Sequence, residues 1–100
     1  MSVTLFSPRD LSVRVGDRAR ERRLAFGLRQ ADLAIKAGVT LSTLRRFEAG
    51  QNVGFDAVTR IALALRAESE VAALFAPVET RSLDQLLESQ KKRSRARKHS

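Results

Sequence analysis

Two short helical segments lie three residues apart near the middle of the sequence, and they restrict the fold more than any other feature. The first segment, residues 30–37, is followed by Gly38, and a residue with positive φ is the usual way to end a helix. Thr40 has the side chain of a helix N-cap, and the second segment, residues 41–49, is followed by Gly50. The pattern predicts two short helices that cross at a tight turn.

The residue types at the crossing fit this arrangement. Ala34 is small where the second helix must approach closely, and Gly38 stands in the turn, where a Cβ atom would be strained. The positions expected to face the crossing are apolar, and they are Leu33, Ala37, Val39, Leu44 and Phe47. Ser42, Thr43, Arg45 and Arg46 leave the outer face polar and basic. We therefore interpret the pair as a helix-turn-helix rather than as an αα-hairpin used only for packing.

A first helix is predicted before this pair. Ser7 has the character of an N-cap, and Pro8 suits the first helical position. Gly16 weakens the middle of the helix, so a start nearer Val13 is the alternative. Its apolar positions recur at three- to four-residue steps or their multiples, and they are Leu11, Val15, Ala19 and Phe26.

Two further helices complete the predicted all-α domain of five helices, residues 10–76. A fourth helix over residues 55–65 is expected to bury Phe55, Val58, Ile61, Ala62 and Leu65, and a fifth covers residues 70–75, before Pro77. Short extensions flank the domain: residues 1–9 contain a β-prone run at 3–6, and residues 77–90 form a linker with one short amphipathic helix. Residues 91–100 are predicted to be a disordered basic tail.

Composition narrows the classes of function. The formal net charge of +8 on 100 residues favours a polyanionic partner, either nucleic acid or an acidic membrane. The longest apolar run, residues 61–65, is far below the roughly 20 residues that span a bilayer, and the first residues do not form a secretory signal. With no cysteine and only His99, we expect no metal, no cofactor and no enzymatic activity. We expect a soluble protein of the bacterial cytoplasm, associated with the nucleoid.

Residues 12–66 resemble the Xre/Cro family of helix-turn-helix proteins, which includes phage repressors, bacterial regulators and antitoxins. The resemblance is carried, in order, by Arg23, Gly27, Leu28, Gln30, Leu33, Ala34, Gly38, Val39, Thr40, Leu44, Glu48 and Gly50, with Ile61, Ala62 and Leu65 closing the domain. It implies a lambda-repressor-like fold and binding to double-stranded DNA, with the second helix of the pair in the major groove.

The resemblance assigns DNA contacts to Arg29, Gln30, Thr40, Leu41, Ser42, Thr43, Arg45, Arg46, Gln51 and Asn52. Gln30, at the positive end of its helix, suits a phosphate, while Arg46 is suited to a bidentate contact with guanine. Arg45, Gln51 and Asn52 are better placed for phosphates. The family also implies an internal salt bridge between Arg23 and Glu48. We interpret this pair as stabilising the fold rather than as contacting a ligand.

Two residues depart from the family pattern. Arg29 occupies the cap position before Gln30, where Thr, Ser or Asn is usual, so the helix forgoes a hydrogen bond of about 1 kcal/mol. Leu41 replaces a polar residue at the first base-contacting position and offers only apolar contact, as to a thymine methyl group. Specificity is then expected to depend on Arg46 and on DNA shape.

These features predict a sequence-specific repressor that binds a palindromic operator as a homodimer. The narrower resemblance, to HipB-like antitoxins, implies autoregulation and a HipA-like kinase toxin as partner. Two alternatives remain: an adaptor that uses the same helices to bind proteins, and a nucleoid-type protein without sequence preference. The dimer contact is assigned to apolar residues outside the five-helix core, which are Val3, Leu5, Phe6, Leu83, Leu86 and Leu87.

Overall fold

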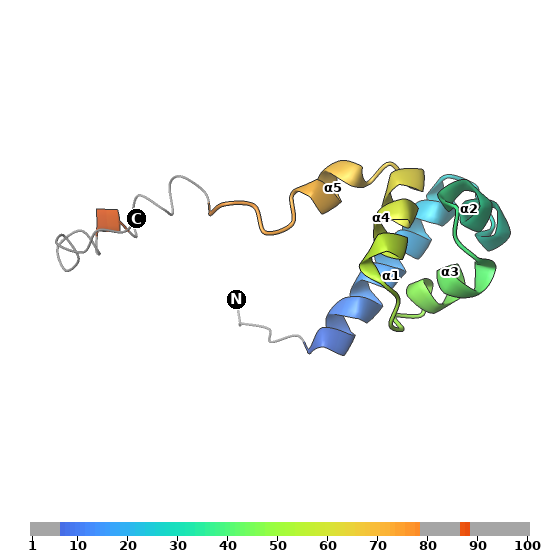
Figure 1. Cartoon of the computed structure of the whole chain (residues 1–100), viewed down its shortest axis with the longest axis horizontal. Coiled ribbons are helices and arrows are strands. Elements are labelled where there is room, and N and C mark those ends of the chain that lie inside the picture. Colours follow the sequence, from blue (N-terminus) through green and yellow to red (C-terminus); the bar gives the residue numbers. More distant parts are fainter. Residues whose placement is uncertain (1–6, 79–86, 89–100) are drawn as a thin grey trace.

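The computed structural model describes residues 7–78 together with residues 87 and 88. Within residues 7–78 the chain forms five α-helices and no strands, as the sequence predicts (Figure 1). They are α1 (Pro8–Ala25), α2 (Gln30–Ala37), α3 (Leu41–Glu48), α4 (Phe55–Ala64) and α5 (Glu68–Ala72). The predicted β-prone run at 3–6 and the basic tail at 91–100 lie outside the described residues.

Helix α1 begins at Pro8, not near Val13, because its first turn is closed by a complete capping box. The Ser7 hydroxyl accepts a hydrogen bond from the backbone N–H of Asp10 at 3.0 Å. The Asp10 carboxylate in turn accepts one from the backbone N–H of Ser7 at 3.2 Å. These two bonds satisfy amide groups that an uncapped helix leaves unpaired, so the helix extends a full two turns before Gly16.

Gly16 is buried where α1 crosses the end of α3. A Cβ atom at this position would lie 2.3 Å from the carbonyl oxygen of Phe47 and 2.9 Å from that of Glu48. Both obstacles are backbone atoms, which cannot rotate away as a flexible side chain can. The glycine that sequence propensity marks as a weakness of the helix therefore permits the closest contact between α1 and α3.

The core lies between α2, α3 and α4. Leu33, Leu44 and Ile61 are its largest fully buried side chains, one from each of these helices. The apolar positions of α1 are less buried than their spacing predicts, because Leu11, Val15 and Phe26 remain 47–48% exposed. Phe55, expected in the core at the start of α4, is 61% exposed. Periodicity identifies an apolar face, and the neighbours that are present decide how far that face is buried.

The end of the domain differs from the predicted fifth helix. Arg66 adopts a left-handed conformation, with φ 59°, and α5 then begins at Glu68 and ends at Ala72, before Phe75 and Pro77 are reached. Phe75, the predicted last residue of the helix, also has φ 59° and is fully exposed. Residues 73–78, which follow α5, lead away from the other helices (Figure 1).

Candidate nucleic-acid interface

The turn between α2 and α3 is built as its sequence predicts. Gly38 ends α2 with φ 72°, and the backbone N–H of Val39 donates to the carbonyl of Ala34 at 3.0 Å. Thr40 caps α3 by accepting a hydrogen bond from the backbone N–H of Thr43 at 3.0 Å. The two threonine hydroxyls are also hydrogen-bonded to each other, at 2.9 Å. This turn fixes the angle at which α3 leaves the core.

Helix α3 has one buried face and one exposed face. Leu44, Phe47 and Glu48 point into the protein, whereas Ser42, Arg45 and Arg46 are exposed. The acidic side chain of the helix is Glu48, which is buried, so the exposed face of α3 is polar and positively charged. The helix lies at the edge of the molecule, away from α5 (Figure 1). It is therefore accessible to a large, negatively charged partner.

A buried ion pair joins this helix to α1. The Nε of Arg23 donates to one carboxylate oxygen of Glu48 at 2.7 Å, and its Nη2 donates to the other at 3.0 Å. Both side chains are less than a tenth exposed. The remaining Nη1 of Arg23 donates to the carbonyl of Leu28 at 2.9 Å. The ion pair implied by the family resemblance is thus present and bidentate, which is the stronger geometry for such a pair.

Gln30 connects this buried pair to the surface. Its side-chain nitrogen donates to Glu48 at 3.0 Å, and its side-chain oxygen accepts from the Nε of Arg45 at 3.4 Å. If the amide were reversed, its oxygen would face the carboxylate, so Glu48 fixes the orientation of the amide. The sequence suggested a phosphate contact for Gln30, and its bond to Glu48 was missed because residues 18 positions apart had to be brought together by the fold.

Arg46 does not project freely from α3. Its guanidinium group donates to the backbone carbonyl of Asn52, in the loop that follows the helix. The same loop is held by the backbone N–H of Gln51, which donates to the carbonyl of Arg46 at 2.8 Å. Gln51 and Asn52 are both exposed. Arg46 and these two residues therefore form one surface at the carboxyl end of α3.

Arg29, at the start of α2, is paired with an acidic neighbour. The carboxylate of Asp32 accepts bonds at 3.1 Å from the Nε, the Nη2 and the backbone N–H of Arg29. The side-chain bond first, and then the backbone bond, hold the pKa of Asp32 below its usual value. As expected, Arg29 supplies no oxygen to cap the helix. Only one of the two bonds of a capping box is therefore formed, the one that the Asp32 carboxylate accepts from the backbone N–H of Arg29.

Leu41 and Thr43 are less exposed than base-contacting residues are expected to be. Both are intermediate in exposure, and Leu41 packs against the hydrophobic core. Only part of the Leu41 side chain is available to a ligand. Ser42, between them, is exposed. The amino-terminal turn of α3 therefore presents small polar groups and one partly covered apolar side chain.

These elements match a known domain. A family model described as a helix-turn-helix domain matches residues 14–75, from the second turn of α1 to the residues that follow α5. The chain belongs to this helix-turn-helix family. A comparison with curated proteins gave no match. None of the helices in the described part of the chain is both long and apolar enough to cross a membrane.

The residues assigned to dimerisation lie mostly beyond the described helix-turn-helix domain. Val3, Leu5, Phe6, Leu83 and Leu86 fall outside the described residues. Leu87 is described, and it is 47% exposed. The assignment of the dimer contact to these residues stays a prediction.

Proposed function

We propose that this helix-turn-helix chain binds double-stranded DNA, with α3 in the major groove, and represses transcription as a homodimer. The observation that carries the proposal is the division of α3 into a buried face and an exposed, positively charged face. A helix used only for packing has no need of two adjacent exposed arginines at its outer surface. The formal net charge of +8 supports the same partner, because phosphate contacts supply much of the affinity for DNA.

The residues assigned to DNA contact divide into two roles under this proposal. Those on the exposed face of α3 and at its cap contact bases, and they are Thr40, Leu41, Ser42, Thr43 and Arg46. Those around the start of α2 and the end of α3 contact phosphates, and they are Arg29, Gln30, Arg45, Gln51 and Asn52. In the free protein, Arg46 is bonded to the carbonyl of Asn52. A hydrogen bond from a charged group contributes about 1.5–3 kcal/mol, which is similar to the roughly 1–3 kcal/mol of a bidentate contact with guanine. Arg46 can therefore exchange one contact for the other on binding, and the discrimination it supplies comes from the guanine contact, which only the right base pair offers.

Substitution of Arg46 tests the proposal directly. We expect Arg46→Ala to weaken binding to the best operator by about 1–3 kcal/mol and to relax the preference at one base pair. Arg46→Lys keeps the charge but not the bidentate geometry, so it should keep affinity for random DNA while losing that preference. Fluorescence anisotropy on an operator selected from random sequences, with random DNA in parallel, measures both quantities. Thermal melts of each variant report whether the fold has changed.

Arg20→Ala is the matched control, because Arg20 is an exposed arginine of α1 that is assigned to neither bases nor phosphates. It should leave the base preference unchanged. If Arg46→Ala weakens all sequences equally, Arg46 contacts phosphate and not bases. If the intact chain selects no sequence at all, the nucleoid-type alternative replaces the repressor. If it does not bind DNA, the adaptor alternative stands.

The basic tail is assigned a different role from α3. Residues 91–100, which lie outside the described residues, carry a run of Lys and Arg. Deleting them should lower affinity for every DNA sequence alike and flatten the salt dependence by about 0.9 in slope for each phosphate contact removed. Anisotropy titrations over a range of salt concentrations measure this slope. A loss confined to the operator would assign the tail to base contacts instead.

Two copies are needed for sequence selection under this proposal. One recognition helix contacts only a few base pairs, and about 1–3 kcal/mol per pair does not select one operator from a genome. A twofold dimer places two α3 helices about 34 Å apart, one in each of two successive major grooves. A DNase footprint upstream of the chain's own gene would show two protected half-sites related by a palindrome.

The narrower proposal, an autoregulating antitoxin of the HipB type in the bacterial cytoplasm, rests on the family resemblance. The Ser7–Pro8 start of α1, which is capped, is a feature shared with these antitoxins and supports the proposal. The test is co-expression with the product of the neighbouring reading frame. A HipA-like kinase that co-purifies in fixed stoichiometry and is inhibited by the chain supports the proposal. A neighbouring frame unrelated to kinases removes it.

A further inference from the structure

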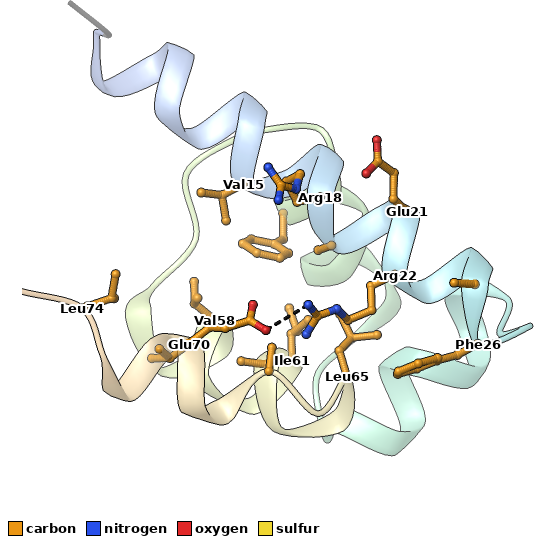
Figure 2. A pocket seen from close by; sticks show the side chains of 16 residues that line it. Val15, Arg18, Glu21, Arg22, Phe26, Val58, Ile61, Leu65, Glu70 and Leu74 are labelled. Atoms are coloured by element: carbon orange, nitrogen blue, oxygen red, sulfur yellow. Dashed lines mark hydrogen bonds and ion pairs between the residues drawn. The ribbon is translucent and has the colours of Figure 1, made fainter. Parts of the chain in front are cut away.

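A groove of about 660 Å³ lies between α1, α4 and α5, on the part of the molecule that the DNA-binding proposal does not use. Its floor is the edge of the hydrophobic core, at Ile61 and Leu65. Most of the side chains that line it are apolar, among them Val15, Ala19, Phe26, Val58, Val71 and Leu74. Figure 2 shows these walls, with α1 on one side and α4 and α5 on the other.

The groove continues into an exposed apolar surface at the end of the domain. Val15, Phe26 and Leu74, which line the groove, are each about half exposed. Phe75 and Val78, just beyond, are 101% and 57% exposed. Soluble monomers rarely expose contiguous apolar patches of this kind unless the patch binds a partner. The groove therefore lacks a partner within the described residues.

The rim of the groove carries charges of both signs: α1 contributes Arg18, Glu21 and Arg22, and α5 contributes Glu70. Arg18 and Arg22, one helical turn apart on α1, line the groove. Arg22 reaches across it to Glu70 of α5 at 2.9 Å, as Figure 2 shows. Arg18 forms no ion pair within the described residues, so a partner segment that carries a carboxylate beside its apolar groups can pair with it.

One segment of this chain has that composition. In residues 82–88, Leu83, Leu86 and Leu87 recur at the spacing of one helical face, and Asp84 and Glu88 are four residues apart beside them. We propose that the groove binds residues 82–88 of a second copy of the chain, and that the two copies exchange these segments reciprocally. The inference rests on the homodimer of the proposed function and names its contact surface.

The direction of the chain favours a second copy over the same one. After α5, residues 73–78 lead away from the helices, with Phe75 in a left-handed conformation (Figure 1). Only four residues separate Val78 from Leu83. Binding of the segment to its own groove requires the chain to reverse within those four residues, whereas binding to a neighbour uses the direction it already has. The exposed Phe75 and Val78 are then covered by the same contact.

A complementation experiment with full-length chains tests the exchange. The groove variant is Val15→Glu combined with Leu74→Glu, two half-exposed positions that tolerate a polar residue. The segment variant is Leu83→Glu combined with Leu86→Glu. Each alone should raise the Kd of the dimer by about a hundredfold, because a carboxylate placed in an apolar contact loses its hydration without gaining a partner. Sedimentation and light scattering measure that Kd.

The mixture of the two variants decides between the occupants. The groove variant still has an intact segment and the segment variant an intact groove, so the mixture should form heterodimers of intermediate affinity. If the mixture stays monomeric, or the segment variant alone still forms the normal dimer, the exchange is wrong. A monomeric mixture is expected when residues 82–88 bind the groove of their own chain. A normal dimer of the segment variant is expected when another surface forms the dimer or another ligand fills the groove. Leu63→Glu, at an exposed position of α4 outside the groove, is the control.

Cysteine cross-linking supplies a readout that does not depend on weakening the dimer. The chain contains no cysteine, so one can be placed at Ala19 in one preparation and at Leu86 in another. Under a mild oxidant the mixture should give a covalent heterodimer, and its absence would overturn the proposal. DNA binding is measured separately: a chain that dimerises through the groove but binds no DNA contradicts the proposed function and leaves this inference intact.

Discussion

Two consecutive arginines of α1 point in different directions from the helix and meet very different surroundings. Arg23 is buried against α3, where Glu48 accepts two of its N–H groups and Leu28 a third. Arg22 faces the groove, where it forms one bond to Glu70, whose side chain is 63% exposed. One side of α1 is closed by backbone contact and a buried ion pair. The other side is bridged by a single exposed pair above an apolar surface.

This difference separates what the fold requires from what it leaves for a partner. On the α3 side, loss of one group leaves a buried charge unpaired, which is far more costly than loss of an exposed pair. On the α5 side, water already reaches both charges. We therefore expect substitutions on the α3 side to affect folding and those on the α5 side to affect association. Four measurements can sharpen or break this contrast.

The largest effect is expected for Glu48→Ala. It leaves Arg23 buried without its carboxylate, a loss of about 3–5 kcal/mol. For a domain of this size, each kcal/mol lowers the Tm by roughly 4–8 °C. Thermal melts followed by circular dichroism measure the shift. Glu68→Ala, at an exposed position at the start of α5, is the control and should change little. Equal Tm values for the two variants would show that the buried pair does not stabilise the fold.

A smaller loss is expected for Gly16→Ala. The added Cβ atom meets two backbone carbonyls of α3, so the helices must separate, and overpacking of this kind costs about 1–3 kcal/mol. The higher helix propensity of alanine offsets part of it, about 0.5–1 kcal/mol. Urea denaturation measures the difference, with Ser12→Ala, an exposed position of α1, as the control. A net gain in stability would mean that the contact between α1 and α3 is loose.

Glu70→Ala should have a much smaller effect on folding. Because Glu70 is mostly exposed and Arg22 about a third, the pair contributes no more than about 1 kcal/mol. Salt at molar concentration should remove the difference from the unmodified chain, since exposed charges are screened. The loss from Glu48→Ala should persist in the same salt. A loss from Glu70→Ala as large as that from Glu48→Ala would contradict the contrast between the two sides.

The smallest effect is expected at the exposed pair of Arg29 and Asp32. Because the pKa of Asp32 is lowered in the folded chain, the pair stabilises the fold above the ordinary pKa of an aspartate, about 3.9. That contribution is lost as the pH falls through the lowered value. The unmodified chain should therefore be slightly more stable than Asp32→Asn at neutral pH, and the two should converge in acid. Melts at several pH values test this, and a constant difference would assign the effect to something other than charge.

Local signals were enough to predict most of the helix boundaries. Ser7, Gly38 and Thr40 act through residues within four positions of themselves, and the structure has them as caps or ends where the sequence predicts. The exceptions are instructive. Gly16 was interpreted from its propensity alone, because its reason lies in α3, some 30 residues later in the chain. The same limit affects α5, whose last predicted residues are not helical.

The site was predictable in its residue types but not in its contacts. An exposed, basic α3 follows from the spacing of its apolar residues. The bond from Arg46 to Asn52 and the bond from Gln30 to Glu48 depend on side-chain conformations that spacing does not specify. The groove depends on where α5 comes to lie against α1. Periodicity predicted that Val15 and Phe26 are buried, but about half of the surface of each residue is exposed.

The contacts from Arg23 through Glu48 and Gln30 to Arg45 lead from the interior of the protein to the surface proposed to hold phosphates. Coupling between two equilibria is reciprocal. If DNA binds more tightly when these contacts are formed, the contacts strengthen DNA binding by the same factor by which DNA stabilises the contacts. Operator DNA should then raise the Tm of the chain by mass action. Conversely, Glu48→Gln, at a buried residue assigned no DNA contact, should lower operator affinity, because its uncharged oxygen accepts a weaker hydrogen bond from the amide of Gln30.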